Sequence, residues 1–189
     1  YINIQNNKMP LNLLIIHPEG NIKNNPNLYA FTKILVNEGY NIVIFSLNRP
    51  GIYQGELFEG AYFEYYGTDR RENLKTKLRL LKQNFVHIIG IDQGIIEAGR
   101  MAKVLQIGYS FLSYEIFFDN ELIKLKNTTD LKHKNQSKKA CRNIQFAIVQ
   151  DNVRKSILAE EYNIPLEKIL LMPVAGTGIR PYVKTEYFH

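Results

Sequence analysis

Cysteine is almost absent from this 189-residue chain, and so are long apolar runs. The single cysteine, Cys141, excludes an internal disulfide framework and fits a reducing compartment. No apolar run approaches the roughly 18–20 residues that cross a bilayer, and no basic-then-apolar signal peptide opens the chain. We therefore expect a cytoplasmic protein whose 45% hydrophobic residues build an ordinary globular core.

Several motifs for cofactors and catalysis are also missing. The loop HPEGNIKNNPN, which follows the first predicted strand, has one glycine where a dinucleotide-binding fold needs G-x-G-x-x-G. This excludes a nicotinamide or flavin dehydrogenase. The loop is not a Walker A loop, and the chain has no serine nucleophile elbow. The four histidines and the one cysteine show no metal-ligand spacing, so we expect neither a metal nor a bound cofactor.

The charge is unbalanced, because 24 Lys and Arg against 18 Asp and Glu give a net charge of +6. This excess favours nucleic acid, an anionic membrane surface or a phosphorylated substrate as partner, or it is a solvated basic surface alone. Tyr and Phe alternate within predicted strands and so fit a core, not a base-stacking platform, and we expect no nucleic acid partner. The predicted basic helix 69–83 and the run KHKNQSKKACR are candidates for peripheral contact with lipid headgroups at the inner membrane face.

Near-continuous apolar runs alternate with helical patterns along most of the chain. The apolar runs are LNLLIIH, YNIVIFSL, AYFEYYG, VHIIGI, IGYSFLSYE, IQFAIVQ and KILLMPV. Such alternation predicts an α/β fold, a Rossmann-like three-layer sandwich with a mainly parallel sheet. We expect one domain over residues 9–175. Residues 176–189 would begin an interdomain linker or tail, and residues 1–8 would be an upstream extension or an expression remnant.

Two helical segments carry apolar residues at helical spacing, which predicts the faces that they bury. In the helix that begins near Asp69, the predicted buried stripe consists of Leu74, Leu78, Leu81 and Phe85. In the helix of DNVRKSILAEEYNI, the predicted inward residues are Val153, Ile157 and Leu158.

Carboxylates follow two neighbouring strands of the predicted sheet. Asp92 follows VHIIGI, and Glu115 ends IGYSFLSYE. Ligands bind at the carboxyl ends of strands in open α/β sheets, so we expect both in one crevice as catalytic residues. Asp92 would hold a hydroxyl or accept its proton. The alternative is that Asp92 only caps the next helix, accepting from the N–H groups of Gly94 or Ile95, and that Glu115 caps the segment after it.

Other residues at the same edge are candidates for binding substrate. Three of them belong to the first loop, where helix N–H groups meet phosphates in this fold: Gly20, Asn24 and Asn25. The alternative for this loop is a turn in which one asparagine caps the helix. Gly94 would permit close backbone approach. Gln150 ends the sixth strand, and Arg154, one turn into the helix capped by Asp151, could direct a guanidinium fork into the crevice.

Two long stretches together resemble a known family. The stretch IGIDQGIIEAGRMAKVLQIGYSFLSYEIFF, followed by NIQFAIVQDNVRKSILAEEYNIPLEKILLMPV, is similar to the amino-terminal domain of family-4-like glycosyltransferases of the two-domain GT-B architecture. There the pattern is a strand running into Asp, a helix, "pv.y..hE", then "vi.qd..R...l.....i...ki...P". The resemblance covers roughly residues 11 to 175.

The resemblance implies transfer of a sugar from a nucleotide-sugar donor to a sugar, lipid-linked or protein acceptor. In that family the nucleotide is held mainly by the carboxyl-terminal domain, through a carboxylate motif that this chain lacks, so the acceptor-side domain alone would not turn over. Asp92 would then lie at the catalytic edge of the cleft, and Glu115 would match the family's glutamate after the fifth strand. Gln150 and Arg154 would face the interdomain cleft.

The chain departs from the family pattern at three places. It lacks the Gly-Gly pair of the first loop, it has Gly90 and Ile91 where many relatives have a histidine before the aspartate, and it reads PVAGTG after the last strand. Two alternatives therefore stay open. One is a non-catalytic Rossmann-like binding module, and the other is one half of a sugar-nucleotide epimerase of the same architecture.

Overall fold

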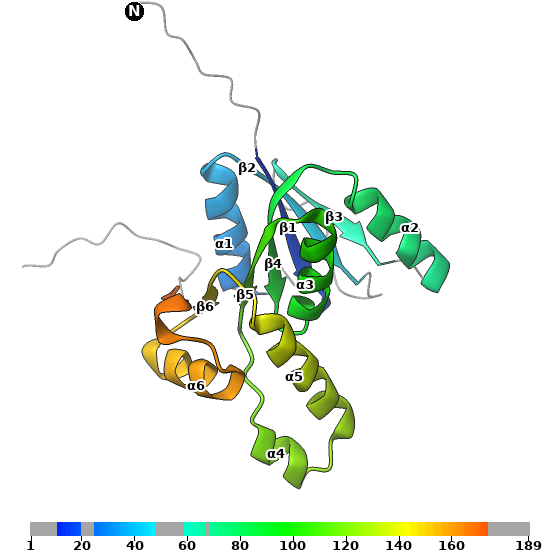
Figure 1. Ribbon diagram of the computed structural model, residues 1–189. Helices are drawn as coiled ribbons and strands as arrows, with labels where there is room; N and C mark the ends of the chain where they lie inside the picture. Colours follow the sequence, from blue (N-terminus) through cyan, green and yellow to red (C-terminus); the bar gives the residue numbers. More distant parts are fainter. Residues whose placement is uncertain (1–10, 20–24, 48–58, 67–68, 174–189) are drawn as a thin grey trace, which may run out of the picture.

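A computed structural model describes residues 11–19, 25–47, 59–66 and 69–173 (Figure 1). The described elements alternate between strand and helix in this order: β1 (Leu11–His17), α1 (Pro26–Asn37), β2 (Tyr40–Ser46), β3 (Ala61–Tyr65), α2 (Arg70–Leu80), β4 (Phe85–Ile91), α3 (Gly94–Leu105), β5 (Gly108–Leu112), α4 (Asp119–Lys124), α5 (Thr128–Cys141), β6 (Ala147–Val149), α6 (Asn152–Tyr162), a short 3₁₀ helix (Leu166–Lys168) and β7 (Ile169–Leu171). The predicted domain limits at residues 9 and 175 lie outside the described residues.

The described strands form one parallel sheet of seven strands in the order β3-β2-β1-β4-β5-β6-β7. Over the described residues, the sheet is built from β1 outward to β3, and the chain then returns to the other side of β1 with β4. The direction of winding therefore reverses between β1 and β4, which is where ligands bind in open sheets of this kind. The predicted α/β, Rossmann-like fold is confirmed, and its sheet is wholly parallel over the described residues.

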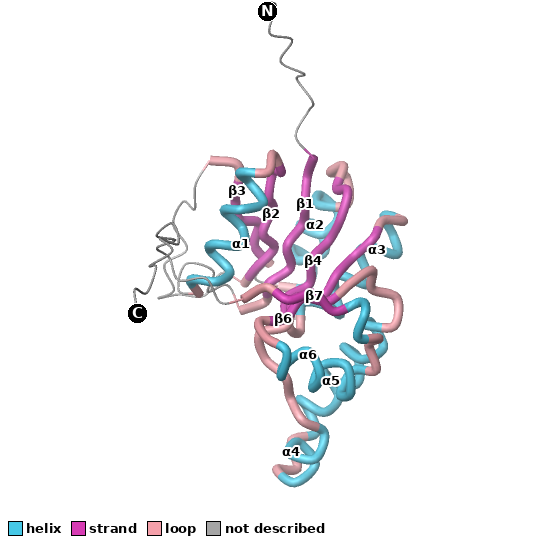
Figure 2. The backbone as a smooth tube through the Cα atoms, turned by 90° about the vertical axis from the view of Figure 1, so that its left-hand side faces the viewer, coloured by secondary structure: helices cyan, strands magenta, loops and turns pink. Residues whose placement is uncertain are grey.

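Helices cover the sheet on both faces (Figures 1 and 2). One core cluster joins α2, α3, α5 and α6 to the face that carries Phe45 and Phe111. The other joins α1, through Leu28, to the face that carries Ile15 and Ile44. Because successive strand residues point to opposite faces, the near-continuous apolar runs supply both clusters. No helix among the described residues is long and apolar enough to span a membrane.

Side-chain caps begin several helices where the sequence predicts. Asn25 accepts a hydrogen bond from the N–H of Leu28 at 3.1 Å and starts α1. Asp151 accepts from the N–H of Arg154 at 2.8 Å and starts α6, as predicted. Gly39 follows α1 with φ +90°, a conformation that glycine adopts without steric strain.

The predicted buried stripe of α2 is wrong in its central residues. Leu74 and Leu78 are 57% and 51% exposed, whereas Thr76 and Leu80 are buried. Leu80 packs into the core cluster of this face and so fixes the rotation of the helix. Leu74 and Leu78 therefore lie on the face opposite the core, whereas Leu81, after the helix, and Phe85, on β4, pack into it.

One residue of the predicted inward face of α6 is also exposed. Val153 is 70% exposed, while Leu158 is fully buried as predicted. Val153 belongs to the first turn of α6, and Leu158 lies deeper along the helix, where it contacts the core.

Candidate functional site

Polar side chains gather at the carboxyl edge of the sheet. They are the last residues of their strands or the residues that follow directly: His17 of β1, Ser46 of β2, Asp92 after β4, Ser113 after β5 and Gln150 after β6. All except Asp92, which is partly exposed, are buried. Buried polar groups are expensive unless they are bonded, so their concentration at one edge marks a candidate ligand site.

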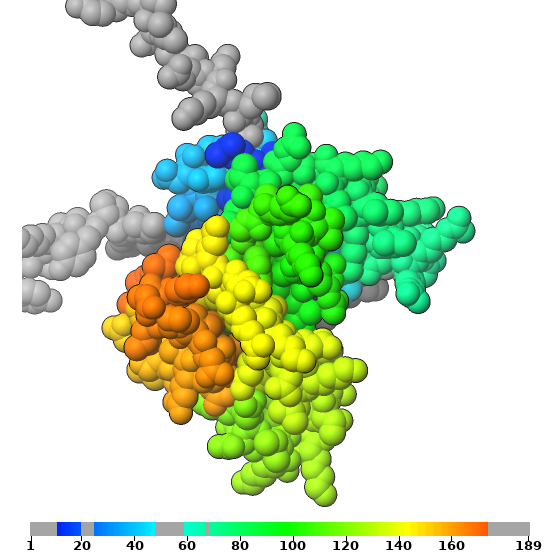
Figure 3. Space-filling view, in the orientation of Figure 1, coloured from blue at the N-terminus to red at the C-terminus, as the bar shows by residue number. Residues whose placement is uncertain are grey.

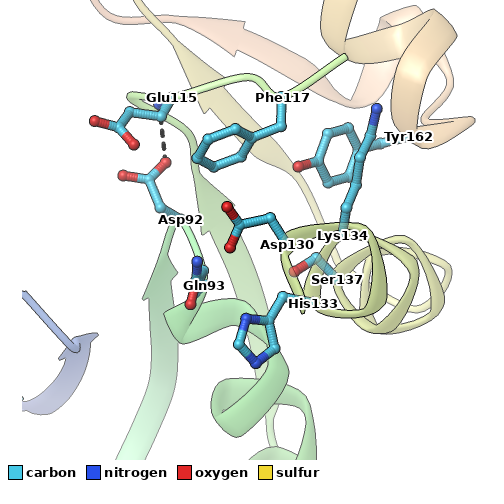
Figure 4. Close-up of a pocket in the computed structure, with 9 residues that line it drawn as sticks. All are labelled: Asp92, Gln93, Glu115, Phe117, Asp130, His133, Lys134, Ser137 and Tyr162. Atoms are coloured by element: carbon cyan, nitrogen blue, oxygen red, sulfur yellow. Dashed lines mark hydrogen bonds between the residues drawn. The ribbon is translucent and has the colours of Figure 1, made fainter. Parts of the chain in front are cut away.

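The carboxylate of Asp92 is held by the next strand, not by its own helix. Its Oδ1 accepts from the N–H of Glu115 at 3.0 Å (Figure 4). The same oxygen accepts from the N–H of Tyr114 at 2.8 Å. The predicted cap to Gly94 or Ile95 is therefore wrong. Asp92 has φ +45°, a left-handed conformation, and the N-cap position of α3 falls on Gln93, whose side chain makes no cap bond. The main-chain carbonyl of Asp92, and not its side chain, meets the N–H of Ile95 at 3.2 Å.

Burial raises the pKa of Asp92 from 3.8 to about 7. The hydrogen bonds from Glu115 and Tyr114 oppose this rise in pKa, and the nearby charges of Glu115 and Glu19 add to it. A carboxyl group with a pKa near neutrality can take up and release a proton at the pH of a cell, which is the property of a general base.

The structure brings Glu115 next to Asp92, from the neighbouring strand end. Glu115 is exposed, and both carboxylates border the same cavity. Gly94 lies against the end of β1, where a Cβ would stand 2.2 Å from the carbonyl oxygen of Ile16. Only glycine lets α3 begin so close to that strand. The predicted role of Gly94 in binding substrate stays a prediction. The catalytic roles of Asp92 and Glu115 stay predictions.

Gln150 and Arg154 both hold the segment that follows β5. Gln150 Nε2 donates to the carbonyl of Ser113 at 3.0 Å, and its Oε1 is buried with no hydrogen-bond partner in the part of the chain that the structure describes. Arg154 Nη1 donates to the carbonyl of Tyr114 at 2.6 Å, and its Nε lies 3.7 Å from Asp151 Oδ2. The guanidinium of Arg154 thus supports the segment whose N–H groups bind Asp92. Its predicted role in binding substrate stays a prediction.

The first loop is described only in part. Asn25 is the residue that caps α1, as the alternative interpretation of the loop requires. Gly20 and Asn24 lie outside the described residues.

Residues of α5 and α6 complete the site, and these were missed in the sequence. A cavity of about 10 Å³, enough for about one water, has one wall at the strand ends and another on these helices (Figure 4). The helical wall consists of Asp130, His133, Lys134, Ser137 and Tyr162. His133, Lys134 and Ser137 lie inside the run KHKNQSKKACR, from which only a basic surface is predicted, and Asp130 lies just before it. Their spacing of three and four residues is the signal that places them on one helix face.

A buried ion-pair network holds this wall in place. The side chain of Lys134 is fully buried, and its Nζ lies 2.8 Å from Asp119 Oδ1 and is also paired with Glu161. Lys138 pairs with the other oxygen of Asp119 at 2.5 Å. The network joins α4, α5 and α6, so Lys134 serves the architecture of the site. Among the described residues, no group of three or more His, Cys, Asp and Glu could hold a metal ion.

No protein-family model matches the chain, and neither does any curated protein sequence. Among solved structures, the chain is similar to the UDP-GlcNAc 2-epimerase from Methanocaldococcus jannaschii, with a TM-score of 0.49 and 15% sequence identity. The similarity covers 86% of this chain and 45% of that chain. This chain therefore spans less than half the length of that enzyme, and the likeness assigns no function.

Proposed function

We propose that this chain is the acceptor-side domain of a glycosyltransferase, in which Asp92 accepts the proton of an acceptor hydroxyl. The observation that carries the proposal is the environment of the Asp92 carboxyl group. Its carboxyl group lies at the carboxyl edge of the sheet, is oriented by two backbone N–H groups, and has a pKa of about 7 because of burial. The family resemblance of the sequence points to the same class of reaction.

The two carboxylate oxygens of Asp92 have different surroundings. Oδ1 is occupied by the N–H groups of Tyr114 and Glu115, whereas Oδ2 has no hydrogen bond within the described residues. A substrate hydroxyl would donate to Oδ2. As its oxygen forms a bond to the anomeric carbon, the bond from that carbon to the nucleoside diphosphate breaks, and the hydroxyl proton passes to Oδ2.

Nearby polar groups fit a ligand rich in hydroxyls. Glu115 is exposed beside Asp92, and its carboxylate can accept from further hydroxyls. The Oε1 of Gln150, after β6, and the Oγ of Ser46, on β2, are buried at the same edge of the sheet, and neither has a hydrogen-bond partner among the described residues. A buried acceptor without a donor is destabilising, and a sugar hydroxyl would supply one.

The test uses the complete gene product with a panel of UDP-, GDP- and ADP-sugars and hydroxyl acceptors. Nucleotide release and the mass of the glycosylated product are measured for the wild type and for Asp92→Asn. The amide keeps an oxygen for the N–H groups of Tyr114 and Glu115 but cannot accept a proton. We expect kcat to fall about 10²–10⁴-fold, the usual contribution of a general base, with KM changed little.

The matched control is Glu160→Gln, which makes the same carboxylate-to-amide change at an exposed position of α6 that does not line the cavity. Its activity should stay within a few-fold of the wild type. Equal loss in both variants would contradict the role of Asp92. If a sugar nucleotide is epimerised and no sugar is transferred, the chain is half of an epimerase. If no donor is consumed, the chain is a binding module.

A further inference from the structure

The solvent-facing side of α2 has apolar residues at its centre. Leu74 and Leu78 are 57% and 51% exposed, while Thr76 and Leu80 are buried. At about 100° per residue, the two leucines lie together on the side opposite the two buried residues. Single exposed leucines are common, but two adjacent ones on the outer face of a helix form a small apolar stripe.

Exposed cations lie around this stripe. Four exposed basic residues have no ion pair within the described part of the chain: Arg70, Arg71, Lys75 and Lys82. On the same helix, Lys77 pairs with Glu97 at 2.8 Å. Arg79 likewise pairs with Glu64 on β3 at 2.7 Å. Within the described residues, the cations that reach α3 and β3 are thus paired, and those around the leucines are not.

The position of α2 makes this surface accessible. The helix lies beside the edge strand β3 and projects from the rim of the molecule (Figures 1 and 3). The helix is polar over most of its length, and its apolar stripe is flanked by Lys and Arg on the outer side. This arrangement suits contact with anionic headgroups more than deep insertion into a membrane.

We propose that α2 docks the protein onto an anionic membrane surface. Leu74 and Leu78 enter the headgroup region, and the four unpaired cations contact lipid phosphates. Other occupants fit less well. In a two-fold contact between copies of this chain the cations would face one another, and a nucleic acid backbone would leave the leucines against phosphate. This inference does not depend on the proposed function.

The chain contains no tryptophan, so one tryptophan can report on the helix. Fluorescence of the purified Leu78→Trp variant is recorded with vesicles of phosphatidylcholine alone and with roughly one third phosphatidylglycerol added. We expect a blue shift with the anionic vesicles only. The matched control is Ile34→Trp, because Ile34 is 50% exposed on α1, which covers the other face of the sheet. Its emission should not change with either vesicle.

Charge reversal gives the second measurement. Arg71→Glu with Lys75→Glu should weaken binding to the anionic vesicles at least ~10-fold, since each basic residue contributes about 1 kcal/mol at such a surface. Lys132→Glu with Lys139→Glu, exposed on α5, makes the same change of net charge and should weaken binding less. Absence of a blue shift, or equal weakening by both pairs, would overturn the proposal. So would a shift produced by an oligonucleotide and not by vesicles.

Discussion

Asp92 has two features that lower the stability of the folded protein. A left-handed backbone at a residue other than glycine is destabilising by about 1–3 kcal/mol, and its carboxyl group is held where ionisation is unfavourable. Such features persist where the surrounding structure enforces them and function uses them. Here the enforcing groups are the N–H groups of Tyr114 and Glu115, which the side chain of Arg154 supports through the carbonyl of Tyr114.

The sequence predicted the location of Asp92 but not its hydrogen bonds. An aspartate between an apolar strand and a helix predicts the edge of the sheet, and the same reasoning placed Glu115 beside it. Whether the side chain turns to its own helix or to the next strand depends on one backbone torsion. A short motif such as IDQG is compatible with either conformation, so the cap prediction failed.

The raised pKa of Asp92 makes stability depend on pH in a defined direction. Between its ordinary pKa of 3.8 and the folded value of about 7, the folded protein binds a proton that the unfolded chain has released. Stability should therefore fall as pH rises through this window and level off above it. Asp92→Asn should lack this fall. Urea unfolding of both proteins from about pH 4 to about pH 8 measures it, and parallel curves would contradict the raised pKa.

At the scale of elements, strands were more predictable than helix faces. Runs such as LNLLIIH and YNIVIFS are apolar because both faces of the sheet are covered. Such short, near-continuous apolar runs fit a buried strand better than a helix. A helix with mixed residues can present either side to the core. The rotation of α2 is set by Leu80 and by the partners of Lys77 and Arg79, which lie on other elements. The apolar spacing of α2 alone could not reveal this.

The ion-pair network between α4, α5 and α6 gives a prediction at this scale. Lys134→Met removes the buried cation and leaves Asp119 and Glu161 without it, which should lower the free energy of unfolding by about 3 kcal/mol. Lys132→Met, at an exposed position of the same helix, should change it by less than about 0.5 kcal/mol. Urea unfolding at neutral pH compares them. Equal stability of the two variants would mean that the network does not hold the helices together.

At the scale of the whole molecule, regions of different charge favour different ligands. The cavity at the carboxyl edge is bordered by the carboxylates of Asp92, Glu115 and Asp130. Lys134, the buried cation beside them, is committed to its own acidic partners. This edge therefore disfavours phosphate and suits neutral hydroxyl groups, whereas the basic excess of the chain lies elsewhere, including on α2.

This separation predicts how the purified 189-residue chain responds to ligands. UDP, GDP and ADP should leave its Tm unchanged, because the phosphates would face carboxylates. At least one neutral saccharide of a panel should raise the Tm by about 2–4 °C at saturation, since a ligand that binds only the folded state stabilises it. The saccharide effect should shrink in Asp92→Asn. A nucleotide that raised the Tm of the wild type and of Asp92→Asn alike would place phosphate recognition on this domain. The acceptor assignment would then be wrong.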